Sequence, residues 1–238
     1  MSGTFRAIRA PNVPAFPSEV ELSSTLEDES QTHITNERGR MRKRIAIFGG
    51  SFNPPGTHHE KMTTPLIVAF DEVIVVPCGD RPDKPTTGSV AAADRAAMAH
   101  LAFGNAASKM RVDDFDLTGG TFMRTIDLQA RYAPLGEIWH VIGTDLIRGG
   151  ANGNAVIQTD WKNGRELWST LNFAVFMRIG SSFNHVDLPP NRKVFYSGTD
   201  GASKTIRRNL AEGLPITGLV SPAVERYIVE HGLYRVAA

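Results

Sequence analysis

Two glycines and two adjacent histidines lie close together near residue 50, and their chemistry suits a bound phosphate. The stretch RIAIFGGSFNPPGTHHEKM places Gly49 and Gly50 directly after a short apolar run. Glycines let the backbone approach an anion closely, and the N–H groups at a helix start point toward it. His58 and His59 follow, where they add hydrogen-bond donors or positive charge. The pattern predicts a phosphate cradle, although glycine turns after strands also occur without one.

Apolar runs alternate with helical patterns along the rest of the chain. Expected strands cover 44–49, 72–77, 109–117, 137–143 and 172–180, and expected helices cover 58–70, 89–104, 121–133 and 221–234. Such alternation predicts an α/β fold, with a parallel, doubly wound sheet between two helical layers. Ligands of these sheets bind beyond the carboxyl ends of the strands, which marks the loops after Phe48, Val76, Val141 and Phe176. Pro65 lies inside the first helix and predicts either a kink or a short, irregular first turn.

Composition argues against several classes of protein. The chain has 238 residues, a formal net charge of +1 and a single cysteine, Cys78. The balanced charge gives no reason to expect a nucleic-acid or membrane partner, and no apolar run approaches the length of a membrane span. A lone cysteine excludes an internal disulfide and fits a reducing compartment, so we expect a cytoplasmic location. Residues 1–41 are polar and interrupted by prolines, which predicts a poorly ordered tail before a domain at 42–238.

The longer motif around the histidines resembles the entry motif of the nucleotidylyltransferase superfamily. It is most similar to that of the nicotinate/nicotinamide mononucleotide adenylyltransferases, which carry Gly-Gly-(Ser/Thr)-Phe-(Asn/Asp)-Pro and then His-x-Gly-His. The residues that match in order are Gly49, Gly50, Ser51, Phe52, Asn53, Pro54 and Pro55, and His59 falls on the second histidine. The first histidine of the signature is Gly56 here, and the signature glycine is His58. Either His58 supplies the missing imidazole from two residues along, or catalysis is lost.

Stretches further along the chain resemble the same family in the same order. VVPCGDRPDK places Lys84, and also Arg81, where the family has a basic residue in a Pro-rich loop. HVIGTDLI matches the end of the family's fourth strand at Gly143 and Asp145, and Trp161 lies downstream near the family's tryptophan. DRAAM fits an Arg-x-x-Met helix, on which we interpret the arginine as structural.

The last part of the chain carries the final points of similarity. GASKTIRR resembles the motif Ile-Ser-Ser-Thr-x-Ile-Arg, with Ser203 and Arg207 in matching places. Ala202 and Lys204 depart from it. LVSPAVERYIVEHGLY resembles the closing helix of the family, so the resemblance covers about residues 44–234.

The resemblance implies a Rossmann-like nucleotidylyltransferase fold and an adenylyltransferase that joins ATP to nicotinate or nicotinamide mononucleotide, in NAD biosynthesis. It implies catalytic roles for His59, His58 and Arg207. It implies nucleotide binding by Gly49, Gly50, Ser51, Phe52, Gly143, Asp145 and Ser203, and acceptor binding by Lys84 and Trp161. Mg²⁺ would arrive with ATP and keep several waters, so no dedicated set of protein ligands is expected.

Other functions remain open from the sequence. The altered histidine motif and the long loop at 149–164 also fit an enzyme that uses another phosphate acceptor, or CTP in place of ATP. Gly56, Ala202 and Lys204 also fit a homologue that binds nucleotide without turning it over. The sequence does not report the oligomeric state.

Overall fold

The structure is a computed structural model, and it describes residues 42–104, 107–178, 184–197 and 201–235. All of these residues belong to the compact unit that begins at Arg42. The tail expected over 1–41 lies outside the described residues, as do the last two residues of the strand expected at 172–180.

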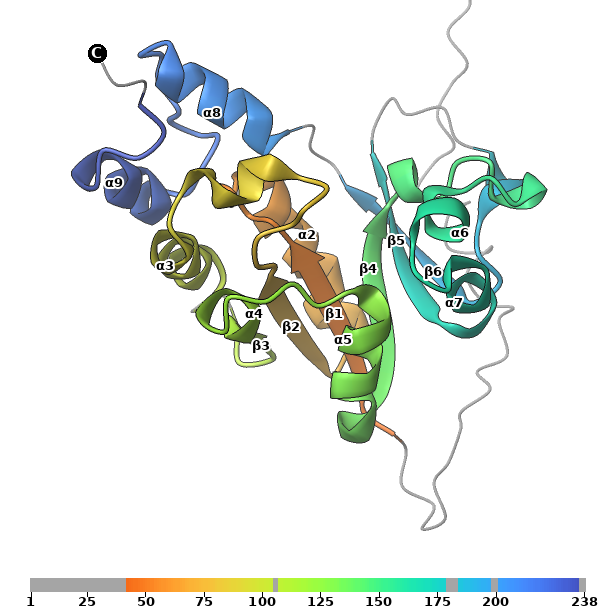
Figure 1. Ribbon diagram of the computed structural model, residues 1–238. Coiled ribbons are helices and arrows are strands. Elements are labelled where there is room, and N and C mark those ends of the chain that lie inside the picture. The colour runs from red at the N-terminus through yellow and green to blue at the C-terminus, as the bar shows by residue number, and fades with distance from the viewer. Residues whose placement is uncertain (1–41, 105–106, 179–183, 198–200, 236–238) are drawn as a thin grey trace, which may run out of the picture. The chain divides into compact units, whose positions relative to one another are not determined.

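A parallel sheet forms the centre of the described unit (Figure 1). Its six strands are β1 (Arg44–Gly50), β2 (Glu72–Pro77), β3 (Met110–Val112), β4 (Glu137–Gly143), β5 (Asn172–Arg178) and β6 (Arg192–Ser197). They lie in the order β3-β2-β1-β4-β5-β6, so the chain moves outward from β1 in one direction and then from β4 in the other. The predicted parallel, doubly wound sheet is confirmed, and its switch point lies between β1 and β4.

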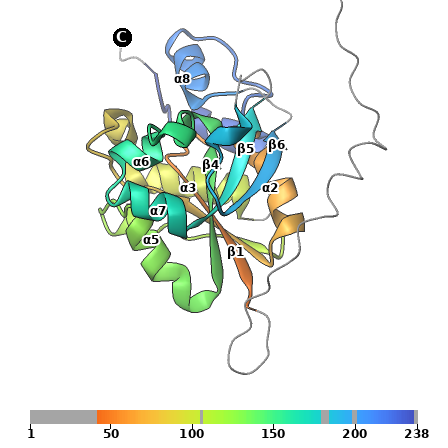
Figure 2. The ribbon, with the colours of Figure 1, turned by 90° about the vertical axis from the view of Figure 1, so that its right-hand side faces the viewer.

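Helices cover both faces of this sheet. On one face lie α2 (Thr57–Ala69) and α3 (Ala92–Phe103), and on the other lie α4 (Phe115–Thr118), α5 (Thr125–Tyr132), α6 (Val156–Asp160) and α7 (Gly164–Thr170). Figure 2 shows α2 on one side of the sheet and α5, α6 and α7 on the other. β1 alternates accordingly: Phe48 packs in the cluster with α2 and α3, whereas Ile47 packs in the cluster with α4 and α5.

The last two helices pack beside α3. They are α8 (Ser203–Ala211) and α9 (Pro222–Glu230), and their apolar faces share a buried cluster that includes Met98, Ile206, Val224 and Ile228. The start of α8 lies next to the turn that follows β1. A hydrogen bond joins them there, from Ser203 Oγ to Pro54 O at 2.8 Å.

The strand expected at 109–117 is wrong in its second half. β3 ends at Val112 and α4 begins at Phe115. The reason is Asp116, which is almost fully buried and accepts hydrogen bonds from Gly79 N and Met123 N. A carboxylate that binds two separate backbone segments requires a tight turn, and an extended strand cannot provide it. The same bonds keep residues 121–124 out of the following helix, so α5 begins at Thr125.

β6 was not predicted. Its sequence RKVFYS carries charge at its start and forms the edge of the sheet, where the continuous apolar run of a central strand is not needed. α2 includes Pro65 within its bounds and begins at Thr57. In the described part of the chain, every helix is too short or too polar to cross a membrane.

Candidate active site

The turn after β1 has a strained backbone that a buried ring holds in place. We call residues 50–56 the phosphate turn. Phe52 adopts a positive φ of 39°, and its side chain is only 2% exposed. Its ring meets Phe48 and Phe103 edge-on, with centroids 5.2 and 5.1 Å away. A Cβ atom at Gly50 would lie 2.9 Å from Phe52 Cζ, so this close approach requires glycine.

Cationic side chains gather around the phosphate turn. Arg95, which is fully buried, donates from Nη2 to Ser51 O at 2.8 Å and to Cys78 O at 2.5 Å. Lys84 Nζ donates to Ser51 Oγ at 3.1 Å, and Arg207 Nη1 donates to Asn53 O at 2.6 Å. These contacts hold positive charge next to a backbone turn, which is the arrangement that a triphosphate requires.

The cations also influence one another. Burial, followed by the nearby Arg81 and Arg207, lowers the pKa of Lys84 below its ordinary value. Repulsion of this kind is relieved when an anion binds, so the site favours a ligand of high negative charge.

His59 is held at the start of α2. Its Nδ1 accepts a hydrogen bond from Gly56 N at 3.1 Å, which leaves the proton of a neutral ring on Nε2. The ring also lies edge-on to Phe52, 5.1 Å between centroids. Packing and hydrogen bonding therefore fix both the tautomer and the direction of this imidazole.

His58 lies in a slot walled by two glycines. A Cβ atom at Gly56 would lie 2.6 Å from His58 Cε1, and a Cβ atom at Gly201 would lie 2.7 Å from His58 Cβ and Cγ. The His58 ring is 3.9 Å from the His59 ring, centroid to centroid. The imidazole of His58 thus occupies the space into which a side chain at position 56 would project. A side chain at position 56 and the His58 imidazole would therefore compete for the same space.

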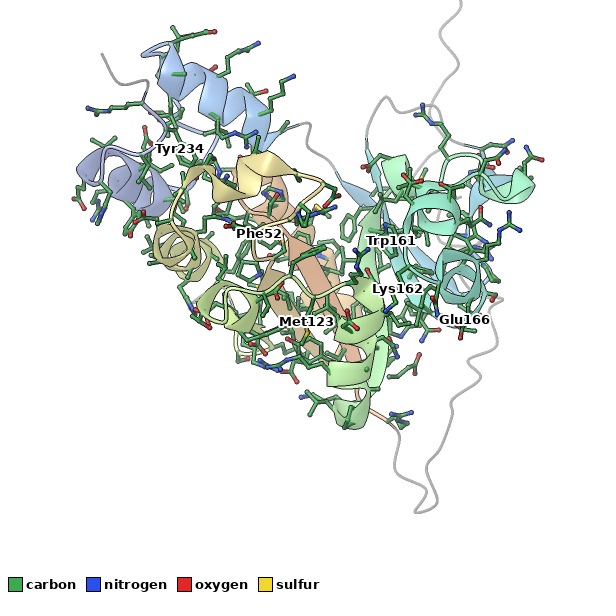
Figure 3. The ribbon with its side chains drawn as sticks, viewed as in Figure 1. Phe52, Met123, Trp161, Lys162, Glu166 and Tyr234 are labelled. Carbon is green, nitrogen blue, oxygen red and sulfur yellow. The ribbon has the colours of Figure 1, made fainter. Side chains whose placement is uncertain are left out.

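A cavity of about 480 Å³ opens at the carboxyl ends of β1, β2 and β4, at the switch point. Its wall begins at Gly49 and Gly50 and extends to Trp161 and Lys162 beside α6. The loop before α5 completes it with Phe122, Met123 and Arg124. Figure 3 shows Trp161 and Lys162 close to the end of β4, with Phe52 toward the centre of the molecule. The cavity therefore joins the glycines of β1 to an aromatic and cationic pocket.

The chemistry of the cavity suits a flat, anionic ligand. The Arg81 guanidinium lies 5.3 Å from the centre of the Phe122 ring and donates from Nε to Asp83 Oδ1 at 3.1 Å. His140 also lines the cavity, where burial lowers its pKa to about 4, so it stays neutral. It contacts Gln129 Oε1 at 2.9 Å, as expected for a satisfied core histidine.

Asp145 lies at the carboxyl edge of β4, close to Gly143. A Cβ atom at Gly143 would lie 2.4 Å from Asp145 Oδ1, and the carboxylate is exposed. Such a hard oxygen donor fits Mg²⁺ or a ribose hydroxyl. No group of three or more His, Cys, Asp and Glu side chains that could hold a metal gathers within residues 42–104, 107–178, 184–197 and 201–235.

The structure places most of the residues predicted from the sequence at two locations, and Gly143 and Asp145, at the end of β4, belong to neither. Around the phosphate turn it gathers Ser51, Phe52, His58, His59, Lys84, Ser203 and Arg207. Gly49, Gly50 and Trp161 line the cavity. Lys84 was expected beside the acceptor, but it does not line the cavity and donates a hydrogen bond to Ser51 of the phosphate turn. Sequence reasoning missed Phe122, Met123, Arg124 and Lys162, which follow no motif that we identified. The one signal for three of them is their position in the loop before a helix.

Comparisons with known proteins show the family of the chain and agree with its fold. A model of the family described as cytidylyltransferase-like matches residues 47–203. The chain is 32% identical to a probable nicotinate-nucleotide adenylyltransferase of Shouchella clausii, over 81% of this chain and 97% of that protein. It is 30% identical to a protein of Chromobacterium violaceum with the same name, over 82% of this chain and 100% of that one. The fold is similar to that of Plasmodium falciparum nicotinic acid mononucleotide adenylyltransferase complexed with NaAD, with a TM-score of 0.65 and 23% identity over 81% and 97% of the two chains.

Proposed function

Since the chain belongs to the cytidylyltransferase-like family, we propose that it is an adenylyltransferase that joins ATP to nicotinate mononucleotide and releases pyrophosphate. The observation that carries the proposal is the cavity that runs from Gly49 and Gly50 to Trp161. One end of it lies at a cationic phosphate turn and the other at aromatic and cationic side chains. A reaction that joins two nucleotides through their phosphates needs this combination. The cytoplasmic location expected from the sequence is part of the same proposal.

In the proposed reaction, a phosphate oxygen of the mononucleotide attacks the α-phosphorus of ATP. A new P–O bond forms at the α-phosphorus. The bond between the α-phosphorus and the oxygen that bridges it to the β-phosphorus breaks, and pyrophosphate leaves with the electron pair. No covalent enzyme intermediate is required, so the protein acts by positioning the two phosphates and by balancing charge.

The phosphate turn would hold the triphosphate. His59 Nε2–H, Lys84 and Arg207 are its donors, and each is already oriented by a bond to the turn. We place His58 beside His59 as a second imidazole, in the position that the glycine at residue 56 leaves open. Donors that are fixed before the reaction stabilise charge on the leaving group without further rearrangement.

The pyridine nucleotide would occupy the aromatic end of the cavity. Trp161 offers a flat face to the pyridinium ring, and Lys162 and Arg124 offer positive charge to its carboxylate. This charge is the reason to favour nicotinate over nicotinamide as the acceptor, because a neutral amide gains less from it.

Mg²⁺ would enter with ATP, and Asp145 would contact its water shell or the ribose. When bound, the ion supplies neutralisation of the charge that develops on the phosphates.

A non-catalytic nucleotide-binding protein is the second candidate, because Gly56 replaces the first histidine of the motif. The observation against it is the position of the His58 ring, which lies where a side chain at residue 56 would project.

The test is to incubate the purified protein with Mg-ATP and a panel of phosphate acceptors, and to separate the products by chromatography. We expect pyrophosphate and the nicotinate dinucleotide in equal amounts, with nicotinamide mononucleotide and CTP used less well. Release of pyrophosphate only with an acceptor other than nicotinate mononucleotide would assign the enzyme a different substrate. Binding of ATP without turnover would support the non-catalytic candidate.

A further inference from the structure

The turn that follows α9 contacts the phosphate turn, although the two are far apart in the sequence. Tyr234 Oη donates a hydrogen bond to Asn53 Oδ1 at 2.5 Å, and lies 4.0 Å from Met98 Sδ. Figure 3 shows Tyr234 on the α9 side of Phe52, opposite the side of Trp161. Burial raises the pKa of Tyr234 above that of free tyrosine, so the hydroxyl keeps its proton at any pH used for an assay.

Asn53 connects this hydroxyl to the rest of the site. Its side chain is 2% exposed, and Nδ2 donates to Thr86 O at 2.5 Å and to Ser89 Oγ at 3.2 Å. Its main-chain carbonyl accepts the bond from Arg207 on α8. The side-chain amide of Asn53 thus links the phosphate turn to the 3₁₀ turn at Pro85–Ser89, and its backbone links the phosphate turn to α8.

The 3₁₀ turn carries Lys84 at its start. Lys84 in turn donates to Ser51 Oγ, so the turn at Pro85–Ser89 and the phosphate turn are held together at two points. If the Asn53 amide rotates, its contact with Thr86 is lost, and with it one of the two points that hold the turn beside Lys84 against the phosphate turn. The hydroxyl of Tyr234 opposes that rotation, because it occupies the acceptor end of the amide and leaves the donor end facing Thr86.

We propose that Tyr234 is a positioning residue for the phosphate site, whose hydroxyl orients Asn53 and thereby holds Lys84 against Ser51. The consequence for catalysis rests on the proposed function, whereas the structural link does not.

The backbone of residues 232–234 directs the Tyr234 side chain toward Asn53. After α9, Gly232 and Tyr234 have positive φ values of 60° and 65°. A tyrosine rarely adopts that conformation, and it persists only where the surroundings fix it. Leu233 and the Tyr234 ring pack against the cluster that contains Val224 and Ile228. The turn therefore directs the ring back toward Asn53.

Tyr227, on α9, provides a control from the same part of the chain. Its hydroxyl donates to Asp94 Oδ1 at 2.9 Å, so it too links α9 to α3. Among the described residues, neither Tyr227 nor Asp94 makes a hydrogen bond to the phosphate turn. Loss of either hydroxyl removes one hydrogen bond made by α9 or by the turn after it, but only loss of the Tyr234 hydroxyl removes a bond to Asn53.

The experiment compares four variants with the wild type: Tyr234→Phe, Tyr227→Phe, Asn53→Ala and the double variant Tyr234→Phe/Asn53→Ala. We expect Tyr234→Phe to lower kcat about five- to tenfold, the range of one hydrogen bond, with the KM for nicotinate mononucleotide within about twofold of the wild type. Tyr227→Phe should keep both constants. Asn53→Ala should lower kcat at least as much as Tyr234→Phe, and the double variant should be no slower than Asn53→Ala.

Equal effects of the two tyrosine variants, or independent effects of Tyr234→Phe and Asn53→Ala, would overturn the inference. Backbone hydrogen exchange over residues 84–90 provides a second readout that needs no turnover. It should be faster in Tyr234→Phe than in Tyr227→Phe, and equal rates would also overturn the inference. A wild-type protein without activity would contradict the proposed function alone, since the exchange comparison still decides the role of Tyr234.

Discussion

The phosphate turn and the aromatic end of the cavity lie at the same edge of the sheet, yet they are built in different ways. The phosphate turn is mainly backbone, shaped by Gly50 and Phe52 and fixed by bonds from Arg95 and Arg207. The aromatic end is made of side chains from separate loops, including Phe122 and Trp161. On the proposed function, the first region would hold a triphosphate in a set shape, and the second would change its ligand when a few side chains change.

The largest effect should come from the histidine that is bonded to the phosphate turn. His59→Ala removes a donor whose tautomer and direction are fixed, so we expect kcat to fall about 10²- to 10³-fold. His100→Ala is the control. It removes an imidazole near the C-terminal end of α3 that is bonded to Asp114, and kcat should stay at the wild-type value. A steady-state assay of pyrophosphate release measures both, and a wild-type kcat for His59→Ala would remove the catalytic role of the phosphate turn.

The second prediction sharpens the account of the glycine-walled slot. His58→Gly alone should lower kcat about a hundredfold, because the slot then holds no imidazole. Gly56→His alone should also be slow, since its Cβ would lie 2.6 Å from His58 Cε1. The double exchange Gly56→His/His58→Gly should recover most of the wild-type kcat, because one imidazole again fills the slot.

The comparison of the double exchange with the single variants decides the matter. If the double variant is as slow as the slower single one, the two positions are not interchangeable and the steric account of the histidine motif fails.

At the aromatic end, the expected effect is smaller and of another kind. Trp161→Ala should raise the KM for nicotinate mononucleotide about tenfold, the range for loss of one stacking face, and leave the KM for ATP unchanged. Trp161→Phe keeps a ring and should recover part of the loss. An equal change in both KM values would show that the two regions do not act separately.

The smallest effect concerns pH at the phosphate turn. Burial and neighbouring cations lower the pKa of Lys84, so its ammonium loses its proton below the usual pH for lysine. Because the charged form binds phosphate, kcat/KM for ATP should fall by a few-fold as the pH rises through that pKa. Lys84→Arg keeps its charge in this range, and the alkaline decline should disappear from its pH profile. A decline that persists in this variant would assign the titration to another group.

The same contrast separates what the sequence predicts from what it does not. β1, β2 and β4 are continuous apolar runs, and their bounds are close to those expected. The phosphate turn is contiguous in sequence, so its motif is visible there. Asp116, by contrast, ends a strand pattern by binding Gly79 and Met123, and only the folded chain brings these residues together. The hydroxyl of Tyr234 and the amide of Asn53 are likewise 181 residues apart, and no local pattern pairs them.

The most direct test of the two-region account is a pair of calorimetric titrations, with a non-hydrolysable ATP analogue and with nicotinate mononucleotide, into Trp161→Ala and Arg207→Gln. We predict that Trp161→Ala loses affinity only for the mononucleotide and that Arg207→Gln loses affinity only for the ATP analogue. Variants that each weaken both ligands to the same degree would contradict the account, because the phosphate turn and the aromatic end would then form a single site.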